Sequence, residues 1–81
     1  MDIERLTEVF RDTFGDANLV LTPDMSPKNL KGWDSFNHIN LILSVEEEFG
    51  VTFTTDEIQS LKSVAELVVL LNNKGQAITW Q

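Results

Sequence analysis

Residues 32–51, GWDSFNHINLILSVEEEFGV, decide the fold of this chain. Asp34 is typical of a helix N-cap, and Gly50 is typical of the position just past a helix end. Between them, apolar side chains recur every three or four residues, which predicts a helix from Ser35 to Phe49. At about 100° per residue, one face of this helix is apolar and is expected to face a core. That face carries Leu41, Ile42, Val45 and Phe49.

The same helix has a second apolar stripe beside the first. Phe36, Ile39 and Leu43 lie at positions i, i+3 and i+7. A wide core face and an exposed edge for a partner protein are both compatible with this spacing. Because Phe36 lies at the very start of the helix, where full burial is hard, the exposed edge gains weight.

Three further helices are expected around this one. Apolar spacing and capping residues predict them at residues 2–14, 54–61 and 63–71, the middle one short. Pro23 and Pro27 disfavour a helix in the long connection 16–32, and residues 51–55 are expected to be an extended connection. No single helix can bury its apolar stripe alone. The prediction is therefore an all-α fold: a small antiparallel four-helix bundle with three main helices, one short helix and a long first loop.

Length and composition limit the classes of function. Eighty-one residues leave room for one core, expected at residues 1–75, with a C-terminal tail at 76–81 in which Trp80 has no assigned role. The chain has no cysteine, and its longest purely apolar run, 67–71, is too short to cross a membrane. Since the first residues are amphipathic and acidic, unlike a signal peptide, a cytoplasmic protein without a membrane partner is expected.

The net charge of −7 argues against nucleic acid as a partner, because phosphate backbones demand clustered Lys and Arg. After Gly32 only Lys62 and Lys74 are basic, against seven acidic residues. An acidic surface that only keeps the protein soluble and a surface that docks onto basic partner proteins have equal weight at this point.

Ser35 and His38 invite comparison with a catalytic nucleophile and its base, since residues three apart on a helix can be neighbours. A serine hydrolase also needs an orienting carboxylate, an oxyanion hole and a cleft. A small bundle with one histidine has little room for these, so we expect no catalytic residue and a half-buried His38 packed under the loop. The consecutive acids 46–48 fan around their helix and no calcium loop is present, so no metal site is expected.

Ser35 is more informative for its position than for its hydroxyl. The first turn of a helix presents free N–H groups and the positive end of the dipole, which favour an anion. A phosphate ester on Ser35 would be tolerated there. Simple capping by Asp34 and Ser35 is the plainer explanation, and the residues by themselves leave both open.

These residues together resemble the acyl carrier proteins. The resemblance runs through most of the chain from Gly32 to Leu71, and helix one and the long loop agree in length and place. It rests on residues 32–36, 39, 41–42, 45–51, 53, 56–58 and 63–67.

The resemblance implies a carrier and not an enzyme. Ser35 would carry 4′-phosphopantetheine, transferred from coenzyme A by a carrier-protein synthase. Acyl groups would be bound to the thiol of this arm as thioesters. Asp34 would lie beside the attachment point and assist the synthase. The other partners of this monomer would be acyl-loading and acyl-processing enzymes. The side chains implied to face partners are Phe36, Ile39, Leu43, Glu46, Glu47, Asp56 and Glu57.

Three departures from the family pattern bear on the pathway. Asn37 and Asn40 stand where acids are frequent, Phe36 replaces a leucine, and Trp33 stands where a small residue is common. They favour a dedicated carrier of a fatty-acid-like, polyketide or related secondary-metabolite pathway, such as one for an unusual acyl unit, over the housekeeping fatty-acid carrier. A D-alanyl carrier, an aminoacyl or peptidyl carrier, and an unmodified interaction module with a carrier-like fold are the alternatives.

Overall fold

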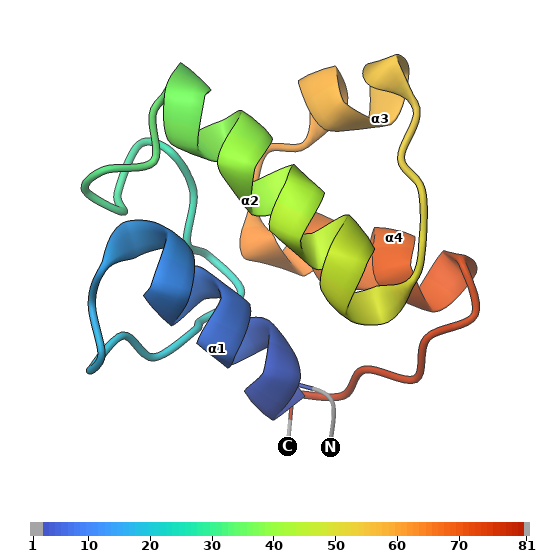
Figure 1. The fold of residues 1–81 in the computed structure, drawn as a ribbon, viewed down its shortest axis with the longest axis horizontal. Helices are drawn as coiled ribbons and strands as arrows, with labels where there is room; N and C mark the ends of the chain where they lie inside the picture. Colours follow the sequence, from blue (N-terminus) through green and yellow to red (C-terminus); the bar gives the residue numbers. More distant parts are fainter. Residues whose placement is uncertain (1–2, 81) are drawn as a thin grey trace.

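A computed structural model describes residues 3–80 and contains, in this range, four α-helices and no strand. The helices are α1 (Ile3–Phe14), α2 (Ser35–Phe49), α3 (Thr55–Ser60) and α4 (Val64–Asn73). α2 runs back against α1, α4 crosses behind α2, and the short α3 lies apart from α1 (Figure 1). The all-α prediction is confirmed, and the bounds of α2 are those expected; position 2, expected to open the first helix, lies outside the described residues.

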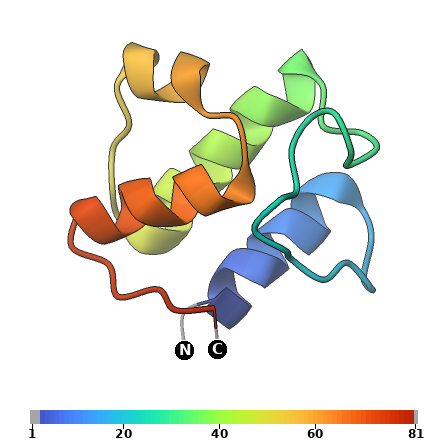
Figure 2. The same cartoon turned by 180° about the vertical axis from the view of Figure 1, so that it is seen from behind.

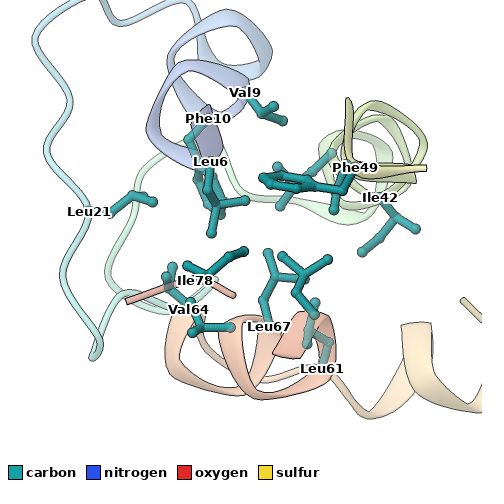
Figure 3. Close-up of a cluster of buried hydrophobic side chains, with 14 of the residues drawn as sticks. Leu6, Val9, Phe10, Leu21, Ile42, Phe49, Leu61, Val64, Leu67 and Ile78 are labelled. Atoms are coloured by element: carbon teal, nitrogen blue, oxygen red, sulfur yellow. The ribbon is translucent and has the colours of Figure 1, made fainter. Parts of the chain in front are cut away.

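One core holds the three long helices together. All four residues assigned to the core face of α2 are buried. Figure 3 shows Phe10 of α1, Phe49 of α2 and Leu67 of α4 meeting in this core, with Leu21 of the long loop beside them. Within residues 3–80, no helix is both long enough and apolar enough to span a membrane.

The long loop between α1 and α2 is anchored on α4. The backbone N–H of Val64 donates to the Met25 carbonyl at 2.9 Å, and the N–H of Ala65 donates to the Pro23 carbonyl at 3.1 Å. These N–H groups belong to the first turn of α4, where backbone N–H groups have no acceptor within their own helix. The loop therefore caps α4 while its buried leucines join the core.

The segment after α4 returns along the bundle to the start of α1 (Figures 1 and 2). Ile78 is buried, and the Asn72 side chain brackets its backbone: Oδ1 accepts from the Ile78 N–H at 2.7 Å, and Nδ2 donates to the Ile78 carbonyl at 3.1 Å. Gln76 donates to the Phe49 carbonyl at 3.2 Å. Trp80, which had no assigned role, is half-buried against the core.

Candidate attachment site and partner surface

Ser35 is the first residue of α2 and is exposed. Asp34 caps the helix: its backbone is extended, and its carboxylate accepts the N–H of Asn37 at 2.9 Å. The first intrahelical bond runs from the N–H of His38 to the Asp34 carbonyl, at 2.8 Å. The N–H groups of Ser35 and Phe36 precede that bond, so the Ser35 hydroxyl lies where the positive end of the helix dipole meets solvent.

The turn into α2 is held by the helix that follows it. Gly32 has φ +93°, a conformation that side chains disfavour. The Asn37 amide donates to the Gly32 carbonyl at 2.7 Å. A carboxylate could not donate this bond, so an amide at position 37 has a local structural role.

Trp33 points into the bundle, where it is only 3% exposed. Its ring meets Phe10 edge-on with centroids 5.7 Å apart, and lies 6.1 Å from Phe14. Its Nε1–H donates to Nδ1 of His38 at 3.0 Å. Trp33 is therefore part of the core.

His38 is half-buried, as expected, but its partners were not predicted. Because the Trp33 indole can only donate, Nδ1 of His38 carries no proton, and the proton of the neutral ring lies on Nε2. Nε2 lies 2.8 Å from the Ile58 carbonyl, to which it donates. With both nitrogens engaged, His38 is not available as a base for Ser35. No sequence pattern points to the Ile58 carbonyl, which belongs to a helix twenty residues further on.

A groove of about 540 Å³ opens beside Ser35, between the start of α2 and α3. Apolar and polar side chains both line this groove, a composition suited to a small flexible group tethered nearby. The lining includes Pro27, Ser35, Ile39, Ile58, Gln59 and Leu61.

The second apolar stripe of α2 faces solvent. Phe36 is 75% exposed, Ile39 50% and Leu43 57%. They make up three of the five large apolar side chains that are exposed within residues 3–80. The wide core face is therefore wrong, and the exposed edge is what the fold presents next to Ser35.

The acids expected to face partners divide into two groups. Glu46 accepts the N–H of Phe53 at 2.9 Å and is half-buried. Glu57 closes a capping box with Thr54, and one of its oxygens lies 3.0 Å from the Lys74 ammonium. These two carboxylates hold the fold together. Glu47 and Asp56 are exposed, and within residues 3–80 their side chains make no hydrogen bond or ion pair.

Glu57 should contribute to the loss of stability in acid. The N–H of Thr54 and the Lys74 side chain hold the pKa of Glu57 below its usual value of 4.5. A lowered folded-state pKa gives stability that is present above pH 4.5 and lost as the pH falls through the folded-state value. We expect Glu57→Gln to flatten the pH dependence of the free energy of unfolding, measured by urea titrations from about pH 3 to 7. Asp56→Asn removes a neighbouring carboxylate without these bonds and serves as the control; an equally steep acid limb in Glu57→Gln would contradict the assignment.

Comparison with known proteins places this geometry in a family. The sequence model described as the phosphopantetheine attachment site matches residues 4–71. The chain belongs to the acyl carrier protein family. The acyl carrier protein of Petrotoga mobilis is 32% identical over 71 residues, covering 88% of this chain and 84% of that protein. The acyl carrier protein of Thermosynechococcus vestitus is 29% identical over 75 residues, covering 93% of each.

Solved structures agree with this acyl carrier protein fold. A holo acyl carrier protein from Geobacter metallireducens is 39% identical, with a TM-score of 0.82 over 91% of this chain and 86% of that chain. A protein from Mycobacterium tuberculosis is 18% identical and shares the fold, with a TM-score of 0.82 over 91% of this chain and 99% of that one.

An acyl carrier protein is a carrier and not a catalyst, and its cofactor is covalently attached phosphopantetheine. When bound, this group supplies the thiol that a chain without cysteine lacks. Phosphopantetheinyl transferases and acyl-processing enzymes are the general partners of the family. An exposed hydroxyl in the first turn of a long helix, beside an open groove, fits attachment through a phosphate ester.

Proposed function

We propose that Ser35 is the residue that bears the phosphopantetheine arm and that Asp34, directly before it, assists the transferase. The observation that supports this most is the exposed hydroxyl of Ser35 at the start of α2, between the groove and the apolar stripe. In the attachment, Ser35 Oγ forms a bond to the phosphorus that bears pantetheine. The pyrophosphate bond of coenzyme A breaks, adenosine 3′,5′-bisphosphate leaves, and the hydroxyl proton passes to a base of the transferase or solvent.

Other serines are less suited to this role. The Ser63 hydroxyl caps α4 by accepting the Glu66 N–H, and the Ser60 hydroxyl donates to the Glu57 carbonyl. Ser44 is half-buried in the third turn of α2.

The test is an intact-mass measurement after incubation with coenzyme A, magnesium and a broad-specificity carrier-protein synthase. We expect the wild-type chain to gain the mass of one phosphopantetheinyl group and Ser35→Ala to gain nothing. Ser44→Ala, on the same helix, is the matched control and should be modified like the wild type. No gain in the wild type, or a gain that survives in Ser35→Ala, overturns the proposal and leaves an unmodified interaction module with the same fold.

We further propose that the partners dock on the exposed stripe of α2 and on the free carboxylates of Glu47 and Asp56, and that the carrier is a cytoplasmic monomer. The cargo is an acyl thioester of a polyketide or related dedicated pathway. Asn37 is no longer an argument for a dedicated pathway, because its side chain holds the turn at Gly32. Asn40 and Phe36 remain arguments for it. The class of cargo is tested by loading the purified holo-protein with malonyl, D-alanyl and aminoacyl groups, each with its own loading enzyme. We expect efficient charging with malonyl alone.

A further inference from the structure

We propose that His38 is a positioning residue for the attachment site, because its ring ties the turn that carries Ser35 to helix α3. This inference rests on the proposed role of Ser35. His38 touches no reacting atom in it: the ring acts by holding two parts of the chain at a set separation.

The first tie closes the chain around Ser35. Trp33 and His38 flank the serine, and the 3.0 Å bond between their rings joins the residues on its two sides. The two ring planes are 25° apart and the ring centroids 6.1 Å apart. Since Trp33 is itself held by Phe10 and Phe14 of α1, the turn before Ser35 is anchored in the core and has little freedom.

The second tie reaches α3. The Ile58 carbonyl that accepts from His38 lies in the last turn of this helix, where carbonyls have no partner within the helix. α3 has six residues and none of them is fully buried, so few contacts hold it in place. Its other polar ties, the capping box of Thr54 and the ion pair between Glu57 and Lys74, belong to its first turn, whereas the Ile58 carbonyl belongs to its last turn. His38 is therefore the polar tie at the end of α3 that faces the attachment site.

Both ties need one particular form of the ring. Nδ1 must be bare to accept from Trp33, and Nε2 must carry the proton to donate to Ile58. In this form the His38 side chain connects α3 to Trp33, which in turn packs on α1. Ile58 also lines the groove beside Ser35, so the tie that holds α3 sets the width of that groove. A partner that engages both the start of α2 and α3 then meets one rigid surface.

Three variants test the tie through the rate of arm transfer. His38→Leu removes both bonds, and we expect kcat/KM for modification of Ser35 to fall about tenfold, because small misplacements of a reacting group are costly. His38→Gln keeps an amide oxygen for Trp33 and an amide N–H for Ile58, and should retain most of the activity. Trp33→Phe keeps an aromatic ring in the core but removes the donor to Nδ1, and its rate should fall between those of the two His38 variants. Rates are compared at a temperature at which circular dichroism shows each variant fully folded.

Two measurements on the unmodified protein separate positioning from general stability. Nitrogen-15 NMR of the imidazole should show the proton on Nε2 and a bare Nδ1. Amide hydrogen exchange should become faster in α3 of His38→Leu while α1 and α4 stay protected. A wild-type ring protonated on Nδ1, an unchanged kcat/KM in His38→Leu, or a loss in His38→Gln equal to that in His38→Leu overturns the inference.

The outcomes also distinguish this inference from the one on which it rests. If the wild-type chain is not modified at all, the role of Ser35 fails, while the NMR and exchange results still decide whether His38 ties α3. If His38→Leu does not fold, the inference is tested with Trp33→Phe instead. An unchanged kcat/KM for modification of Ser35 in Trp33→Phe, together with unchanged amide hydrogen exchange in α3, overturns the inference.

Discussion

Trp33→Ala is expected to lower the free energy of unfolding by about 3–5 kcal/mol, a typical cost of truncating a buried Trp. Trp33 is 3% exposed, packs edge-on against Phe10 and donates its indole N–H to His38. Alanine removes the ring contacts, leaves a cavity between α1 and the start of α2, and leaves Nδ1 of His38 without its donor. Because small domains are commonly stable by about 5–15 kcal/mol, the loss is a large share of the total.

Urea titration monitored by circular dichroism measures the effect, and Trp80→Ala is the matched control. Trp80 is only half-buried near the end of the chain, so its truncation should cost clearly less. A loss of under about 1 kcal/mol in Trp33→Ala, or equal losses in the two variants, would mean that Trp33 does not anchor the turn before Ser35.

Leu43→Glu should leave the fold intact and impair docking. Leu43 is 57% exposed on α2, in line with Phe36 and Ile39 and two turns from Ser35, so the core does not depend on it. A carboxylate in the middle of an apolar contact must be desolvated when a partner binds. Apolar anchors at the centre of an interface are commonly worth about 2 kcal/mol or more, and we therefore expect kcat/KM for arm transfer by the synthase to fall about 30-fold or more.

The control for this prediction lies on a different helix. Val69 of α4 is also 57% exposed, so Val69→Glu adds the same charge at an equally accessible apolar position. Its kcat/KM should stay close to that of the wild type, and thermal melts should show both variants folded. Equal losses in the two variants would indicate a general effect of charge, and no loss in Leu43→Glu would remove the stripe from the docking surface.

The helices could be predicted from the sequence because their signals are local. Asp34 and Gly50 mark the ends of α2, and the apolar period between them assigns its core face. The exposure of Phe36 and its stripe could not be decided this way, since the same spacing suits a wide buried face. That outcome depends on where α3 and α4 come to lie.

Ser35 could also be proposed as the attachment residue from its position at the start of a helix, but the residues around it could not be predicted. His38 could be assigned as half-buried, yet its acceptor is the backbone carbonyl of Ile58, and a carbonyl has no sequence signal. The acidic residues also show that the sequence does not reveal which side chains have partners in the folded chain. Glu46 and Glu47 look alike in the sequence, and only the folded chain shows that one holds Phe53 while the other is free in solvent.

The anchoring of the long loop on α4 sets an order of events during synthesis. Pro23 and Met25 find their partners at Ala65 and Val64, about forty residues later in the chain. Contacts so distant in sequence form late, since the chain between them must first be made and closed into a loop. A nascent chain that has already exposed Ser35 therefore still lacks the contacts that anchor the loop before it on α4. The loop before Ser35 is therefore ordered only after the start of α4 has been made, so modification at the proposed attachment site should favour chains that already contain α4.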